Sequence, residues 1–340
     1  MNKLFLTAQA VFLTIVMPHF SDITPEFNGA YQGTLQEFTI VDNVSMAKGT
    51  PIVDIFKRAN ILKRRDASCE VEWSKIARAS TRKITVDEIY GATKICEVEF
   101  YQGCLKDLED GNNNFAKQVV AFFKSAIGMD VATNAYFGDV SRASDDEFSW
   151  NIFDGVMTKI AKYVADNNPD YKPTIAGAIP AGAITPANAF AYFQAAIDAQ
   201  PMNLENAAPT QKYFTVDYDL AKALWRYYQS IGEKSGDIYI YQNGQPTLQF
   251  DGVPVLVEPT WKALLRKLNG GTQAHSMVLT LRKNFIWGTN KTFNKNLTNG
   301  KAMKVWYSED DFHWKYLLEL VAGTEIISPK DIVVLQTEFA

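Results

Sequence analysis

The sequence has little cysteine and little histidine for its length. Among 340 residues the only cysteines are Cys69, Cys96 and Cys104, with no C-x-x-C pair. So sparse a set excludes a disulfide framework, fits a reducing compartment and predicts buried structural thiols. The only histidines are His19, His275 and His313. They show no ligand spacing to one another or to the cysteines, so we expect no metal site.

Motifs for nucleotide binding and for nucleophilic catalysis are also missing. There is no G-x-G-x-x-G and no G-x-S-x-G, and the segment 232–235 only resembles the end of a phosphate-binding loop, because Glu233 stands where that loop requires glycine. The acidic runs 145–147 and 309–311 are typical of solvated turns, since consecutive carboxylates point in different directions. We therefore expect no catalytic residue and no cofactor, and we expect that the chain is not an enzyme.

Long hydrophobic runs are absent except at the N-terminus, where Leu4 to Met17 is apolar. This run is too short to span a bilayer. It favours an arm that packs against a neighbouring subunit over a secretory signal, and it predicts no membrane association. The alternative, a secreted bacterial surface or binding protein, depends on this run and on glycosylation sequons at Asn43, Asn290 and Asn296.

Apolar residues, by contrast, are plentiful. They make up 47% of the chain, which is enough for a sizeable core, and the length predicts two lobes or one lobe with long excursions. The formal net charge is −4. That balance argues against a protein whose main role is to grip nucleic acid, because such chains are usually strongly basic.

Residues 49–100 carry alternating stretches at 69–73 and 95–100, a period that is typical of strands, and together they predict a long β-hairpin. Its charge is polarised, with a basic limb at residues 57–83 and mostly acidic residues at 84–110. Ordinary solvated surface would explain this pattern, and so would contacts between subunits. The second interpretation assigns an interface to Lys63, Arg64, Arg65, Arg78, Arg82 and Lys83.

A long amphipathic helix is predicted over residues 113–137, and it ends at a Gly-Asp turn. Its apolar stripe, expected to pack on a β layer, comprises Phe115, Val119, Phe122 and Phe123. Shorter helices are predicted at 156–167, 186–199 and 217–231, and a connector rich in Pro, Ala and Gly at 169–186. Strands are predicted at 237–242, 247–257 and 277–287.

Three segments follow the long helix in a recognisable order: 251–257, 277–289 and 323–335. In that order and spacing they resemble the major capsid proteins of tailed bacteriophages, of the Hong Kong ninety-seven type. The positions that carry the resemblance are Gly252, Pro254, Gly288, Gly323 and Pro329.

The resemblance implies an α+β fold with an N-terminal arm, an extended β-hairpin loop, a peripheral domain on a spine helix, and an axial domain. The corresponding ranges are 1–48 for the arm, 49–100 for the extended loop, 101–168 for the peripheral domain with its spine helix at 113–137, 169–300 for the axial domain, and 301–340 for the C-terminal strands.

The resemblance also implies a function. Copies would self-assemble into hexamers and pentamers of an icosahedral head around double-stranded DNA, in a virion capsid that is assembled in the host cytoplasm. Possible further partners are scaffolding, portal and decoration proteins, with the packaged DNA held by non-specific proximity. The shell protein of an encapsulin-type nanocompartment remains an alternative with the same fold.

Overall fold

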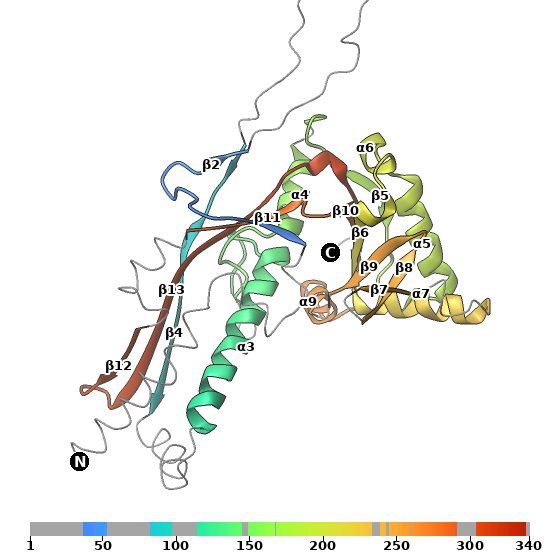
Figure 1. The fold of residues 1–340 in the computed structure, drawn as a ribbon. Helices are drawn as coiled ribbons and strands as arrows, with labels where there is room; N and C mark the ends of the chain where they lie inside the picture. Colours follow the sequence, from blue (N-terminus) through green and yellow to red (C-terminus); the bar gives the residue numbers. More distant parts are fainter. Residues whose placement is uncertain are drawn as a thin grey trace, which may run out of the picture.

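The computed structural model describes residues 37–52, 82–96, 114–144, 149–166, 168–232, 239–242, 245–258, 260–290 and 304–337. In this part of the chain two β-sheets form two lobes (Figure 1). One lobe is elongated and is built on a long helix, and the other is a sheet with helices packed against it.

The elongated lobe contains a five-stranded sheet around β13 (His313–Ile326). Its other strands are β1 (Phe38–Val41), β4 (Asp87–Cys96), β11 (Phe285–Thr289) and β12 (Lys304–Ser308). β4 and β12 pair with the same residues at the start of β13, so they lie along its two edges. All pairs in this sheet are antiparallel except β1 with β11.

The second lobe contains a mixed sheet in the order β5-β14-β10-β6-β9-β8-β7. Its strands are β5 (Thr174–Ala178), β6 (Lys212–Val216), β7 (Tyr239–Gln242), β8 (Gln245–Phe250), β9 (Val253–Val257), β10 (Ser276–Leu281) and β14 (Ile332–Gln336). Successive residues of a strand point to opposite faces, and in β6, β10 and β14 residues on both faces are buried. That double burial explains why β14 begins with a continuous apolar run and why apolar residues lie on both faces of β10.

Helices cover this sheet on both sides. One face packs in a single core with α5 (Pro186–Asp198) and α7 (Tyr218–Ser230). The other face shares a core with α4 (Val156–Ala165), α9 (Trp261–Leu268) and the end of α3 (Asn114–Phe137). The short α6 (Met202–Glu205) and the 3₁₀ turns at Pro209–Gln211 and Pro329–Asp331 complete the described helical elements.

Helix α3 occupies the range predicted for the spine helix, and its C-terminal end joins the two lobes. Trp261 of α9 lies against Tyr136 and Phe137, with ring centroids 5.1 and 5.3 Å apart. All three side chains are buried. The four apolar residues predicted to form the core stripe, Phe115, Val119, Phe122 and Phe123, belong to α3, but their side chains lie outside the described residues.

The prediction of single strands at 277–287 and 247–257 was wrong in one respect. Lys283 has φ 59°, and the chain turns there from β10 in one sheet to β11 in the other. Asp251 and Gly252, with φ 49° and 73°, likewise divide the second segment into β8 and β9. Residues at positive φ cannot continue a β-strand, so each apolar run becomes two strands.

The hairpin predicted over 49–100 stays a prediction. Its second limb, where it is described, is β4, and β4 pairs along its whole length with β13. The first strand of that hairpin, 69–73, and residues 97–100 lie outside the described residues. Several elements were not predicted: β5 lies within the expected connector 169–186, α6 and β6 lie between the predicted helices 186–199 and 217–231, and helix α9 follows β9.

Candidate functional site: assembly surfaces

Among the described residues, no group of three or more His, Cys, Asp or Glu side chains could hold a metal ion. No helix in the same part of the chain combines the length and apolarity needed to cross a bilayer. The candidate functional features are surfaces and the contacts that position them.

The base of the expected extended loop is the two-stranded pair of β2 (Thr50–Pro51) and β3 (Lys83–Ile84). Pro51 is opposite Lys83, and the amide of Ile52 donates a hydrogen bond of 3.0 Å to the carbonyl of Arg82. The chain thus leaves the body at Ile52 and returns at Arg82, at adjacent points. Of the six residues assigned to the interface, Lys63, Arg64, Arg65 and Arg78 fall between these points, outside the described residues.

Arg82 fixes this base to the body of its own subunit. Its guanidinium donates hydrogen bonds of 2.6 Å to the carbonyls of Ile326 and Ile327, at the end of β13. It also lies over the ring of Tyr171, 4.7 Å from the centroid, where a cation is attracted to the aromatic face. The structure therefore places Arg82 in an intramolecular anchor, whereas the neighbouring Lys83 is exposed.

A buried carboxylate extends this anchor into helix α4. Glu325 accepts hydrogen bonds of 2.9 Å from Tyr163 Oη and from Lys159 Nζ, and Arg82 donates to the same tyrosine oxygen at 3.3 Å. Burial, followed by the charge of Glu325, raises the pKa of Tyr163 above its ordinary value, so this hydroxyl stays protonated. Sequence reasoning missed the network because its members are far apart in the chain.

Two motif glycines, Gly288 of β11 and Gly323 of β13, are directly opposite each other in the register. A Cβ on Gly323 would lie 2.2 Å from the carbonyl oxygen of Thr85, and one on Gly288 would lie 2.8 Å from a methyl group of Ile84. The absence of both side chains therefore lets the segment between β3 and β4 cross the sheet closely. The sequence marked both glycines but could not show that they meet.

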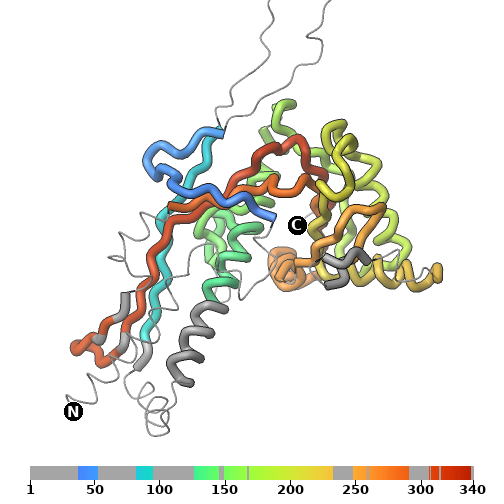
Figure 2. Tube along the Cα trace, in the orientation of Figure 1, coloured from blue at the N-terminus to red at the C-terminus, as the bar shows by residue number. Residues whose placement is uncertain are grey.

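The other motif positions shape turns. Gly252, at φ 73°, occupies the turn before β9, and Pro254 stands in β9 opposite Gln249 of β8. Pro329 is buried and begins the 3₁₀ turn before β14. Asn284, between β10 and β11, contacts Ser328, between β13 and β14. Its carboxamide donates a hydrogen bond to Ser328 O at 3.0 Å and accepts one from Ser328 N at 2.8 Å, so the two turns are hydrogen bonded to each other. Figure 2 shows the C-terminal segment passing between the lobes at this junction.

A second buried polar network lies in the lobe of the seven-stranded sheet. The two nitrogens of His275 face acceptors: Nδ1 lies 3.3 Å from both carboxylate oxygens of Asp217, and Nε2 lies 2.8 Å from Gly182 O. A neutral imidazole could donate to only one of them, so the arrangement favours the imidazolium. Despite the cost of burial, these hydrogen bonds raise the pKa of His275 above its ordinary value. Asp217 also caps α7, and it thereby connects the loop at Gly182 to that helix.

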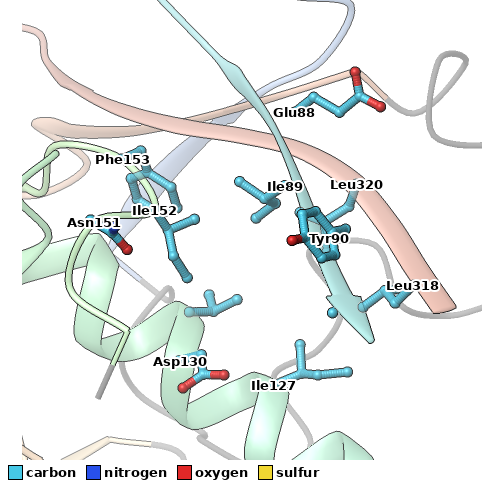
Figure 3. A pocket seen from close by; sticks show the side chains of 12 residues that line it. Glu88, Ile89, Tyr90, Ile127, Asp130, Asn151, Ile152, Phe153, Leu318 and Leu320 are labelled. Carbon is cyan, nitrogen blue, oxygen red and sulfur yellow. The ribbon is translucent and has the colours of Figure 1, made fainter. Parts of the chain in front are cut away.

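An apolar groove of about 240 Å³ lies between α3 and β4 (Figure 3). Ile127 and Val131 line it from the helix, and Ile89 and Leu320 line it from the strands. Asp130 also lines the groove, where burial raises the pKa of its carboxyl. The groove contains no arrangement of groups suited to catalysis, but it offers an apolar surface at the side of the spine helix.

No known protein family and no curated protein sequence matches this chain. Solved structures do match it along nearly its whole length. A chain of the procapsid of satellite phage P4, solved with its size determination (Sid) protein, is 11% identical with a TM-score of 0.55; the match covers 92% of this chain and 96% of that one.

Two further structures match at a similar level. The capsid of an empty GTA particle has a TM-score of 0.53 at 11% identity, with 91% of this chain and 96% of that chain covered. The holo-SrpI encapsulin complex from Synechococcus elongatus PCC 7942 has a TM-score of 0.51 at 11% identity, with 92% and 87% covered. At this identity the similarity concerns the fold. This chain has the α+β fold of tailed-phage major capsid proteins.

Proposed function

We propose that the chain is a major capsid protein that self-assembles into hexamers and pentamers of an icosahedral phage head around double-stranded DNA. The observation that carries this proposal is the match of nearly the entire chain to nearly the entire chain of shell proteins. At most 9% of this chain falls outside these matches.

We assign the proposed domains as follows from the two lobes. Residues 101–168 form the peripheral domain around spine helix α3, and residues 169–300 form the axial domain around the symmetry axes. Residues 1–48 are the arm, 49–100 contain the extended loop, and 301–340 return to the body. Because Ile52 and Arg82 are hydrogen bonded, the loop can project without distorting the sheet from which it leaves.

Self-association is the first property to test. The full chain, expressed alone, should sediment as large particles, and negative-stain microscopy should show closed shells of uniform diameter. Co-expression with scaffolding, portal or decoration proteins of the same genome tests the further proposed partners. A monodisperse monomer under all of these conditions would overturn the proposal.

A nanocompartment shell is the second candidate, favoured by the match to the SrpI encapsulin complex. The contents of purified shells separate the two. Nuclease-protected double-stranded DNA supports the phage head, whereas a stoichiometric enclosed protein supports the nanocompartment.

A further inference from the structure

The solvent side of helix α7 carries an unusual set of side chains. Tyr218, Lys222, Trp225 and Arg226 are all exposed, and their spacing of four, three and one residues places them along one side of the helix. The opposite side of α7 is buried in the core of its lobe. Tyr218 is 48% exposed and Trp225 is 40% exposed, so both present large apolar area to solvent.

Helix α9 continues this surface. Lys222 Nζ from α7 and Lys262 Nζ from α9 each lie 5.7 Å from the centroid of the Tyr218 ring. Both ammonium groups are therefore held beside one aromatic ring. Arg266, one turn after Lys262, is exposed as well, and its Nε donates to Gly271 O at 2.8 Å. We call this surface the basic–aromatic face; it comprises Tyr218, Lys222, Trp225, Arg226, Lys262 and Arg266.

The charge of the face is opposite in sign to that of the chain. Against these four cations, helices α7 and α9 carry a single acidic residue, Asp219, in a protein of net charge −4. Asp219 is already bound by Lys262 Nζ at 2.8 Å and by Gln273 Nε2 at 2.6 Å. Within the part of the chain that the structure describes, Lys222 and Arg226 form no salt bridge with an acidic side chain. Their charges are thus available to an outside partner.

We infer that the basic–aromatic face binds the phosphate backbone of double-stranded nucleic acid enclosed by the shell. Lys, Arg and Tyr side chains are typical phosphate contacts, which fix a duplex in place without reading its sequence. An acidic protein surface would satisfy the cations equally well. A duplex is, however, the polyanion that the proposed shell would enclose, and it presents one phosphate charge per about 1.7 Å of helix axis. The inference rests on the proposed function, because it requires this face to point toward the contents of the shell.

Binding is measured on the purified full chain with a fluorescently labelled duplex of random sequence, by anisotropy over a range of salt concentrations. The test variant is Lys222→Glu with Arg226→Glu. The matched control is Lys48→Glu with Lys94→Glu, which makes the same charge change at two exposed lysines of the other lobe. Circular dichroism melting should be unchanged in both variants.

We expect the test variant to weaken the Kd for the duplex by at least about tenfold at 0.1 M salt. It should also reduce the slope of log K against log salt by about 2, since each phosphate contact contributes about 0.9. The control should leave both quantities within about twofold.

Equal losses in the two variants would overturn the inference, because only overall charge would then matter. A wild-type chain that does not bind the duplex would also overturn it. Unchanged duplex binding with defective assembly of the test variant would indicate an acidic protein partner and would also overturn it.

Failure of the proposed function has a different signature. Shells that contain protein cargo and no DNA, formed by a chain that still binds the duplex through this face, would contradict the phage-head proposal and the enclosed duplex as the natural partner, but would leave the face itself as a site that binds duplex phosphates.

Discussion

At the residue scale, the segment between β3 and β4 crosses closely over β11 and β13 because two residues beneath it are glycines and have no Cβ. Gly323 and Gly288 face each other, and Thr85 and Ile84 pass directly over them. Neither glycine has a positive φ, so their role is steric and not conformational. A methyl group at Gly323 would meet backbone, which can move only if the crossing segment shifts.

We predict that Gly323→Ala lowers the free energy of unfolding by about 1–3 kcal/mol or more, the usual cost of overpacking. Urea denaturation of the unassembled subunit measures the change. Gly91→Ala in β4 is the control, because a Cβ there meets nothing within 4 Å, and its stability should be equal or slightly higher. Equal stability of Gly323→Ala and wild type would show that the crossing is looser than described.

His275 supplies a pH dependence. Its folded pKa is raised above the ordinary value of about 6.5, so its contribution to stability is complete below that pH and is lost as the pH rises through the folded pKa. The groups that face it are Asp217 and the carbonyl of Gly182, with Asp219 nearby.

We therefore predict that His275→Gln costs about 1.5–3 kcal/mol at pH 6, the value of hydrogen bonds to charged groups, and less at pH 8.5. Urea midpoints of variant and wild type across this range give the difference. His313→Gln should keep the pH dependence of the wild type, because His313 does not belong to this network. A cost for His275→Gln that stays constant with pH would contradict a charged imidazole.

At the scale of elements, the anchor of the β2–β3 pair combines distant parts of the chain. Arg82 binds carbonyls that follow it by 244 and 245 residues. Those carbonyls lie at the end of β13, where the chain leaves the five-stranded sheet. The anchor therefore connects the root of the loop to the junction between the lobes.

Arg82→Ala should lower the free energy of unfolding by about 2–4 kcal/mol, because two charge-assisted hydrogen bonds are lost. The measurement is urea denaturation at pH 7. Lys83→Ala, the exposed neighbour, should change stability by less than about 0.5 kcal/mol. Similar small effects of both substitutions would mean that the guanidinium is not an anchor.

At the scale of the whole molecule, the basic limb of the loop remains a prediction about assembly. Since Arg82 serves its own subunit, the test uses Lys63, Arg64, Arg65 and Arg78, all changed to Glu. Each exposed ion pair is worth only about 0–1 kcal/mol, but every interface of a shell would repeat the loss. We expect a folded subunit that fails to form shells in negative-stain micrographs. Normal empty shells with poor DNA retention would instead indicate a basic limb that faces DNA.

The sequence by itself determined the positions of the main helices and the motif order that carries the family resemblance. The periodicity of apolar residues predicted helices at the positions of α3, α4, α5 and α7, because a helix that packs on a sheet must carry an apolar stripe whatever the rest of the fold. The order of the motifs around Gly252, Gly288 and Gly323 carried the resemblance that the fold confirms.

The tertiary structure alone decided where the strands divide and what they touch. An apolar run buried on both faces has the same pattern whether it forms one strand or two, so only the sheets reveal the break at Lys283. The pairing of Gly288 with Gly323 and the partners of Arg82 depend on register between distant strands, which no local period encodes. The same is true of the basic–aromatic face, since helices α7 and α9 share it only after both have packed on their sheet.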